Sequence, residues 1–359
     1  MIFYYIIFFT LACLSILEIL GLKKNQDQAI FYIFSGILFI LSFIRWECGT
    51  DWDSYLDFYE HLPATVDNSD FELFYFYVNH LGDFLFNSYT GVLFICAVII
   101  FFFQTKAINE QSILPITSLF ILFGSSLGNV FFARQTISTM VLFYSIRFIQ
   151  LNRFKPFVLC VIIATLFHYS SLVFLPAWFI YRMKIRPRNL VLFFLLSLLL
   201  SAAVTAVLQS LGNIFGGIIQ YKINHYLGNT GEDSLQGVSF SLFFMLLKGL
   251  LNKAVILLFA ISLCDKISRK YNAFRGYVNL YWMGAIIYFI TAPISLVFVR
   301  FTFSYDISIL IIIPYIITYL SIKMRPLVFI MLTIYLFLRM LMAINSYYEL
   351  YVPYKTIFA

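Results

Sequence analysis

The chain has 359 residues, of which 62% are hydrophobic and only 11% are charged, and its formal net charge is +7. A soluble domain has about 45–50% apolar and about 25% charged residues, so this composition excludes an ordinary soluble protein. It predicts an all-α, polytopic integral membrane protein that forms a single membrane domain over residues 1–359. The basic excess predicts cytoplasmic loops rather than a nucleic-acid surface, because Lys and Arg gather in such loops.

Apolar runs that approach the thickness of a bilayer recur along the chain, since a crossing helix needs about 20 residues. These candidate spans lie at 1–20, 29–45, 91–106, 112–128, 134–151, 190–209, 239–262, 276–296, 303–321 and 325–344. Six basic clusters lie between them, and the positive-inside rule places all six in the cytoplasm. The clusters are Lys23-Lys24, Lys106, Arg153 to Lys155, Arg182 to Arg188, Lys266 to Lys270 and Lys323 to Arg325.

This orientation requires two departures from simple crossing helices. Residues 72–88 contain several polar side chains, which are costly inside a bilayer, so we expect an interfacial or re-entrant helix on the outer side. Residues 156–181 have basic flanks and must go out and return, as a re-entrant or broken helix pair that turns near His168. Roughly 12 membrane segments result, with both termini outside.

A polar island at residues 45–55 interrupts the apolar sequence directly after a predicted span. Charge at a membrane edge is costly unless it is used, so we predict that residues 45–90 form an outer-side catalytic loop and interfacial helix. Residues 210–238 form a second outer-side loop that is rich in Gly. As a hypothesis, that loop is a lid or a glycan groove over the site, and the alternative is a long surface loop.

Three arginines lie on the predicted outer side, against the positive-inside bias. Arg45, Arg134 and Arg300 each begin or end an apolar run. One alternative is that they anchor the helices at lipid headgroups. The other, which we favour, is that they bind an anion, and Arg134 is the strongest candidate because it opens a helix whose N–H groups also attract anions.

Several of these polar elements occur in a recognisable order from about residue 40 to the end. The chain thereby resembles the EpsG/Wzy family of polysaccharide polymerases, although Asp53 departs from the family pattern. The elements are Arg45 with Gly49-Thr50-Asp51 and Tyr55, Arg134-Gln135, Phe167 to Ser170, Arg300 with Tyr305, and Pro353-Tyr354-Lys355.

The resemblance implies a glycosyltransferase that polymerises polyprenyl-diphosphate-linked oligosaccharide repeat units into O-antigen, capsular polysaccharide or exopolysaccharide. It implies a multi-pass protein of the bacterial cytoplasmic membrane whose active site faces the periplasm. The partners would be the lipid-linked oligosaccharide, the growing glycan, the bilayer, and a chain-length regulator and a flippase. The resemblance suggests substrate-binding roles for Thr50, Tyr55, Gln135, Tyr305, Tyr354 and Lys355.

Such a reaction requires cationic groups at the leaving lipid diphosphate and a base at the acceptor hydroxyl. Arg offers a planar fork that fits phosphate oxygens, so Arg45, Arg134 and Arg300 are the catalytic candidates for the diphosphate. His168 and Asp51 compete as general base. We favour His168, because imidazole ordinarily titrates near neutral pH. Asp51 would then orient sugar hydroxyls or pair with Arg45.

We expect no metal and no cofactor. Asp51 and Asp53 form an Asp-x-Asp pair, but two carboxylates are few for Mg²⁺, and no His, Cys or carboxylate cluster has ligand spacing.

A flippase or transporter of lipid-linked oligosaccharides would also need outer arginines, although such transporters often have two repeated halves, which this sequence lacks. An O-antigen ligase-like enzyme would differ from a polymerase only in its acceptor.

Overall fold

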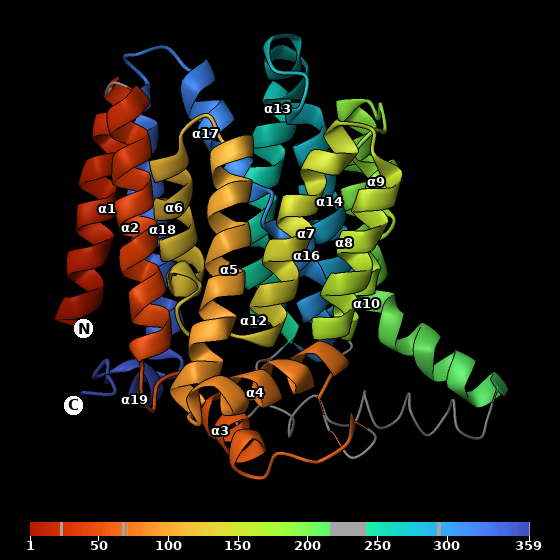
Figure 1. The fold of residues 1–359 in the computed structure, drawn as a ribbon. Coiled ribbons are helices and arrows are strands. Elements are labelled where there is room, and N and C mark those ends of the chain that lie inside the picture. Colours follow the sequence, from red (N-terminus) through yellow and green to blue (C-terminus); the bar gives the residue numbers. More distant parts are fainter. Residues whose placement is uncertain (22–23, 67–68, 70, 216–241, 293–295, 359) are drawn as a thin grey trace. The chain divides into compact units, whose positions relative to one another are not determined.

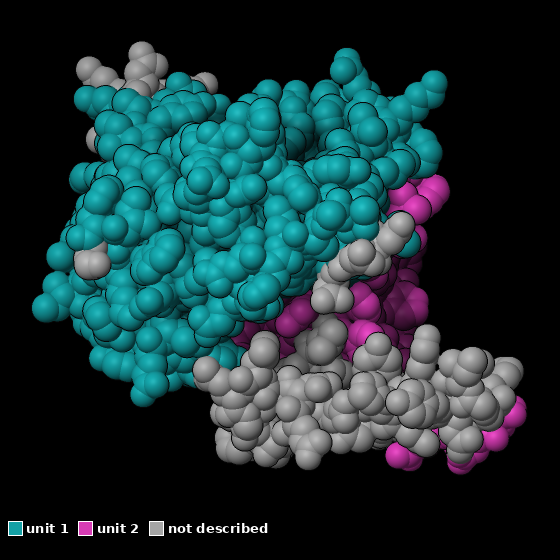
Figure 2. Space-filling view, turned by 60° about the horizontal axis from the view of Figure 1, so that its bottom comes forward, with its two compact units in different colours: residues 1–172, 313–359 teal, residues 173–312 magenta. Residues whose placement is uncertain are grey.

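The computed structural model describes the whole chain except residues 22–23, 67–68, 70, 216–241, 293–295 and 359. Within the described part, all elements are helices, and one isolated bridge joins Arg45 to Thr356. The all-α prediction is confirmed. The chain divides into two compact units, which Figure 2 colours separately: residues 1–172 with 313–359, and residues 173–312.

Unit 1 contains α1 (Ile2–Leu20), α2 (Lys24–Ile44), α3 (Trp52–Glu60), α4 (Leu73–Phe86), α5 (Tyr89–Gln111), α6 (Pro115–Ser126), η2 (Leu127–Asn129), α7 (Arg134–Gln150), α8 (Phe154–Phe167), α18 (Arg325–Asn345) and α19 (Tyr348–Tyr351). Unit 2 contains α9 (Ala177–Ile180), α10 (Pro187–Phe215), α12 (Leu242–Gly249), η4 (Leu250–Ala254), α13 (Val255–Lys270), α14 (Phe274–Thr291), α15 (Leu296–Val299), η5 (Arg300–Thr302) and α16 (Phe303–Asp306). The boundaries fall in η3 (Tyr169–Phe174) and α17 (Ile309–Tyr319).

Among the described residues, six helical segments are long and apolar enough to cross a membrane. They are Ile2–Leu20, Gln26–Ile44, Tyr89–Gln111, Met245–Lys270, Arg300–Tyr319 and Arg325–Asn345. Each overlaps a predicted apolar run, and Met245–Lys270 extends beyond the predicted span 239–262 through the basic cluster Lys266 to Lys270. The predicted runs 112–128, 134–151 and 276–296 form shorter or more polar helices, and in α10 only Pro187–Leu200 qualifies as a shorter apolar helix among the described residues. The total of about twelve segments therefore stays a prediction, as does the return path at 156–181.

In unit 1, α5 packs against α2, α4 and α7, and α6 packs against α1 and α18. The ionisable side chain of Glu18 lies inside this packing. Glu18 of α1 is 4% exposed and accepts hydrogen bonds from the N–H groups of Ile116 and Thr117 and from the Thr117 hydroxyl. A buried carboxylate needs such partners, and here it satisfies the first N–H groups of α6.

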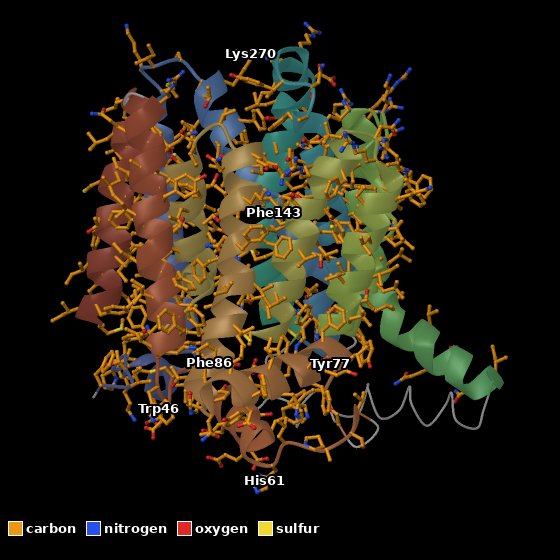
Figure 3. The ribbon with its side chains drawn as sticks, viewed as in Figure 1. Trp46, His61, Tyr77, Phe86, Phe143 and Lys270 are labelled. Carbon is orange, nitrogen blue, oxygen red and sulfur yellow. The ribbon has the colours of Figure 1, made fainter. Side chains whose placement is uncertain are left out.

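The helices α3 and α4 lie across one end of the long helices of unit 1 (Figure 1). The α4 helix has 14 residues, too few to cross a bilayer. One face is buried against α5, where a Cβ on Gly82 would lie 2.5 Å from Val92 Cγ2, and Phe84 on the other face is 85% exposed. Figure 3 places Tyr77 and Phe86 on this helix. An apolar exposed face suits a helix at the membrane surface, although that placement stays a prediction.

The end of the chain pairs with the polar island. The N–H of Trp46 donates to the carbonyl of Lys355, and the N–H of Ile357 donates to the carbonyl of Ile44. The Tyr4 hydroxyl donates to the carbonyl of Tyr351 at 2.6 Å. The start of α1, the polar island and the tail therefore meet at the end of unit 1 where α3 and α4 lie (Figure 1).

In unit 2, α14 packs against α10, α13 and α16. The amine of Lys253 in η4 lies inside an apolar segment, where it pairs with the Asp306 carboxylate, and the Thr302 hydroxyl donates to the same carboxylate oxygen at 2.8 Å. The partnered carboxylate explains how this charge is tolerated. The α10 helix reaches Phe215, so residues 210–215 of the predicted loop 210–238 are helical, and the rest of that loop lies outside the described residues.

Candidate functional site

Five polar residues from four helix ends meet at one end of unit 1. Asp51 and Tyr55 belong to the start of α3, Glu72 directly precedes α4, Arg134 is the first residue of α7, and His168 directly follows α8. We call this group the Glu72 cluster. Because every member sits at a helix terminus, the side chains are placed by the ends of packed helices rather than by a loose loop.

Glu72 lies at the centre of the cluster. Its Oε1 atom is 3.0 Å from Nδ1 of His168, and its Oε2 atom is 2.5 Å from Nη1 of Arg134. The exposed fractions of the Glu72, His168 and Arg134 side chains are 6%, 14% and 17%. One buried carboxylate therefore bridges the predicted base and the best predicted anion ligand.

The electrostatics favour a charged carboxylate at this position. Burial opposes the ionisation of Glu72, but the hydrogen bond from His168 and the charge of Arg134 outweigh that effect and lower the pKa of Glu72 to about 2. Glu72 is thus an anion throughout the physiological pH range, and it acts only as a hydrogen-bond acceptor there.

Arg134 extends the network to the polar island. Its Nε donates to the Tyr55 hydroxyl at 3.2 Å, and that hydroxyl is 3.4 Å from Oδ2 of Asp51, to which it donates. Burial raises the pKa of Tyr55 to about 12, so the phenol keeps its proton at neutral pH. The guanidinium carbon lies 4.1 Å from the Phe71 ring centroid. Among the described residues, the Nη2 group of Arg134 has no hydrogen-bond partner.

His168 occupies the predicted helix break. The α8 helix ends at Phe167, and the backbone of His168 is extended, with φ −160° and ψ 116°. The Phe167 ring packs edge-on against Phe74 of α4, with centroids 5.3 Å apart. This contact holds the end of α8 beside the start of α4. The Nε2 atom of His168 has no hydrogen-bond partner in the described part of the chain.

The turn that precedes Arg134 has an unusual backbone conformation. Leu127, Gly128 and Asn129 have φ values of 52°, 67° and 64°, all in the left-handed region. Such a conformation is costly for residues other than Gly and persists only where the surroundings enforce it. The Asn129 amide donates to Gln104 Oε1 at 2.9 Å on α5. This anchored turn determines where α7, and with it Arg134, begins.

Arg45 lies outside the Glu72 cluster, in the loop that the tail covers. The residue is 3% exposed, and its guanidinium donates to the carbonyls of Ser42 and Cys48, at 3.2 and 2.7 Å. Gly49 follows with φ 110°, and a Cβ there would lie 3.0 Å from Arg45 Nη1. The bonds of Arg45 thus stabilise the loop backbone, and none of them joins it to Asp51.

The other predicted site residues are spread over both units. The Thr50 hydroxyl is 3.4 Å from Oδ1 of Asp51, and Gln135 is the second residue of α7. In the tail, Tyr354 donates to the carbonyl of Leu41 at 2.5 Å, and Lys355 pairs with Glu47 at 2.7 Å.

Arg300 and Tyr305 belong to unit 2. Arg300 begins η5 and is exposed, while the Tyr305 hydroxyl is buried and donates to the carbonyl of Val173 at 2.8 Å. The roles of both groups of residues stay predictions.

Glu72 is the residue that the sequence analysis left out of the candidate site. The sequence carried one signal for it, a carboxylate directly before an aromatic, apolar helix. An acidic residue at such a position is ordinarily explained by its interaction with the helix dipole, and the Glu72 side chain makes no cap bond. Asp51 precedes α3 in the same way, and its carboxylate is bonded by Tyr55 and Thr50 instead.

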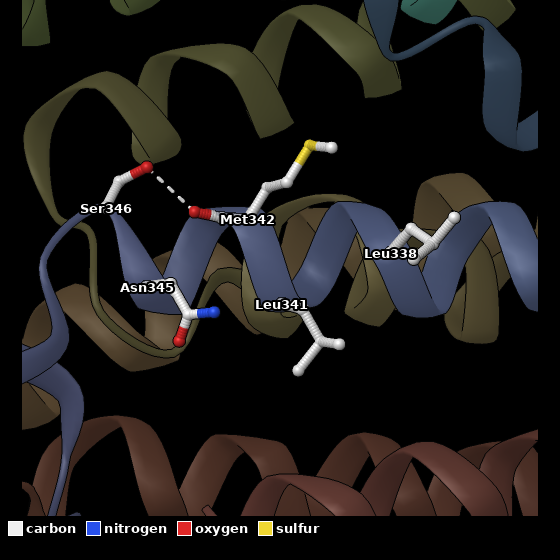
Figure 4. A pocket seen from close by; sticks show the side chains of 5 residues that line it. All are labelled: Leu338, Leu341, Met342, Asn345 and Ser346. Carbon is white, nitrogen blue, oxygen red and sulfur yellow. Dashed lines mark hydrogen bonds between the residues drawn. The ribbon is translucent and has the colours of Figure 1, made fainter.

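Two other features of the described residues do not form a site. In the described residues, no three His, Cys, Asp or Glu side chains gather in a way that would hold a metal ion. A shallow hollow along α18 is lined by one stretch of that helix and the residue after it, as Figure 4 shows: Leu338, Leu341, Met342, Asn345 and Ser346. The Ser346 hydroxyl is already bonded to the carbonyl of Met342, and the lining carries no charge.

A family comparison covers almost the whole chain. The model of the EpsG family matches residues 28–356, which include every member of the Glu72 cluster. No curated protein and no solved structure matches the chain.

Proposed function

Because this chain belongs to the EpsG family, we propose that it is a glycosyltransferase that polymerises polyprenyl-diphosphate-linked oligosaccharide repeat units. The reaction would take place at the outer side of the bacterial cytoplasmic membrane and yield O-antigen, capsular polysaccharide or exopolysaccharide. One observation carries the proposal: Glu72 brings together Arg134, a group suited to a diphosphate, and His168, a group suited to general base catalysis.

In the proposed reaction, a sugar hydroxyl of one lipid-linked unit attacks the anomeric carbon that joins the growing glycan to its lipid diphosphate. The new C–O bond forms, the bond to the diphosphate breaks, and the diphosphate leaves with the bonding electrons. The hydroxyl proton passes to Nε2 of His168, which has no partner in the described part of the chain. General base catalysis of this kind is worth about 10²–10⁴-fold.

Arg134 would bind the departing diphosphate. Its Nη1 and Nε donors are held by Glu72 and Tyr55, so the guanidinium is oriented before substrate arrives. The Nη2 group is left for a phosphate oxygen, and the first N–H groups of α7 add their partial positive charge. Such preorganised donors can contribute about 3–4 kcal/mol each to a developing anion.

The test is an assay of the purified protein in detergent with synthetic lipid-diphosphate repeat units. We expect a ladder of polymer lengths and, for His168→Gln, a loss of about 10²–10⁴-fold with accumulation of the monomeric unit. A protein that only moves the lipid-linked unit across vesicles, without forming a ladder, would identify a flippase. Transfer to a different acceptor, with no ladder, would identify a ligase.

A further inference from the structure

The Glu72 carboxylate faces two neighbours with different hydrogen-bonding abilities. Arg134 has donors and no acceptor, whereas each ring nitrogen of neutral histidine is either a donor or an acceptor. Glu72 is ionised and can only accept, since its pKa is lowered to about 2. The 3.0 Å contact between Oε1 and Nδ1 of His168 therefore requires a proton on Nδ1.

We infer that Glu72 is a positioning residue that holds neutral His168 in the Nδ1–H tautomer and so leaves Nε2 as the atom that accepts the proton. The inference rests on the proposed function for its catalytic meaning, but the tautomer itself is a property of the resting protein. A carboxylate that fixes a catalytic imidazole in this way is a general device of enzyme chemistry.

The second oxygen of Glu72 gives the arrangement its rigidity. Oε2 is bound by Nη1 of Arg134, and Nε of the same guanidinium is bound to Tyr55. The carboxylate thus cannot rotate freely between its two partners. Because the Glu72 side chain is 6% exposed, water has little access to compete for these bonds.

The substitution Glu72→Gln tests the inference directly. The side chain keeps its shape, but an NH₂ donor replaces one of the two carboxylate oxygens that accept hydrogen bonds. Arg134 accepts nothing, so the amide oxygen must face Arg134 and the NH₂ group must face His168. Nδ1 must then accept, and the ring proton moves to Nε2. In that tautomer His168 cannot take a proton at Nε2, so polymer formation should fall by about 10²–10⁴-fold, as for His168→Gln.

The first arm of the test uses no substrate. Protein with ¹⁵N-labelled histidine is examined by NMR in lipid nanodiscs at about pH 8, where an ordinary imidazole is neutral. The chain has four histidines, and the His168→Gln spectrum identifies the signal of His168. We expect Nδ1 protonated in the wild type and Nε2 protonated in Glu72→Gln. A wild-type ring protonated at Nε2, or a ring that Glu72→Gln leaves unchanged, overturns the inference.

The second arm measures polymer formation for Glu72→Gln, His168→Gln and the double variant. Residues that act as one unit show strongly non-additive losses, so the double variant should be no less active than His168→Gln alone. A loss near the product of the two single losses would show that Glu72 acts independently of His168 and would overturn the inference. Glu110→Gln, which alters the surface ion pair with Arg147, is the matched control and should keep full activity.

The two arms separate the possible failures. If the wild-type protein forms no polymer, the proposed function fails, and the NMR arm still decides the tautomer. If the wild-type protein forms polymer and the tautomer is the other one, the proposed function stands and the role of Glu72 is overturned.

Discussion

The Nδ1 atom of His168 lies 3.0 Å from Oε1 of Glu72, although 96 residues separate the two positions in the chain. The contact joins the end of α8 to the start of α4. With Arg134 on the second carboxylate oxygen, it assembles a polar cluster from segments that are remote in sequence.

Replacing Arg134 with Lys should strongly reduce polymer formation while membrane insertion stays normal. Lys keeps the charge but loses the planar fork that now reaches Glu72 and Tyr55 together. We expect a loss of about 10²–10³-fold, the range seen when a preorganised donor is removed. Polymer ladders normalised to folded protein measure it. Arg147→Lys, which changes the pair with Glu110, is the control, and full activity in Arg134→Lys would remove Arg134 from the proposed site.

Arg300→Lys tests the prediction from the sequence that Arg300 binds a diphosphate. Arg300 is exposed at the start of η5. If its guanidinium binds diphosphate by a fork, Lys should reduce polymer formation while the amount of folded protein stays the same. Arg269→Lys, in a predicted cytoplasmic cluster, is a matched control. Equal activity in the two variants would contradict a role for Arg300.

Replacing Arg45 with Lys should reduce stability, and activity should fall in proportion to the folded fraction. The side chain is buried and bonds the carbonyls of Ser42 and Cys48, and a buried polar group left without its partner costs about 1–3 kcal/mol. Thermal unfolding in detergent and activity per folded molecule separate the two effects. Normal unfolding with no activity would instead favour a direct role of Arg45 at the diphosphate.

Acid should lower the free energy of unfolding of the protein, because it protonates Glu72. The folded pKa of Glu72 lies below the ordinary value of a glutamate, near 4.3. Its contribution to stability is therefore complete above that ordinary value and is lost as the pH falls toward about 2. Unfolding midpoints measured between pH 7 and pH 3 should decline less steeply in Glu72→Gln than in the wild type. Parallel curves would contradict the assigned electrostatics.

The proposed topology places the α3–α4 end of unit 1 outside the cell. A Cys introduced at Thr65, which is exposed between these helices, should react with an impermeant thiol reagent in intact spheroplasts. A Cys at Lys323, in a predicted cytoplasmic cluster and also exposed, should react only after lysis. The opposite result would invert the orientation.

Activity should survive treatment with EDTA. The sequence predicts catalysis by arginines in place of a divalent metal, because Asp51 and Asp53 supply few ligands. Polymer ladders formed with and without EDTA, and after added Mg²⁺, measure this. A loss that Mg²⁺ restores would assign Asp51 and Asp53 as metal ligands.

The positions of the helices could be predicted well from the sequence, because apolar runs and basic clusters are local signals. Arg134 and His168 could also be identified from the sequence as candidate site residues, since each is a polar residue at the edge of an apolar run. Glu72, the residue that contacts both of them, could not. A glutamate before a helix has a common local explanation as a charge that favours the helix dipole, and only the packing of α4 against α8 brings Glu72 to His168.

Arg45 shows that the sequence does not reveal which groups an arginine will contact. Both Arg45 and Arg134 lie at the edge of an apolar run and are candidate anion ligands by residue type, although only Arg134 is predicted to open a helix. The difference lies in their partners, which are backbone carbonyls for Arg45 and the side chains of Glu72 and Tyr55 for Arg134. Sequence position gives the kind of group, whereas burial and partners are tertiary properties.

The pairing of the tail with the polar island has a consequence for the order of biosynthesis. Residues 44–49 obtain hydrogen bonds from residues 350–357, through Ile44, Trp46 and Gly49. A ribosome makes the chain from its N-terminus, so this segment emerges early and lacks these partners until residues 350–357 have been made. A partly synthesised chain that lacks residues 350–357 therefore cannot carry the finished loop.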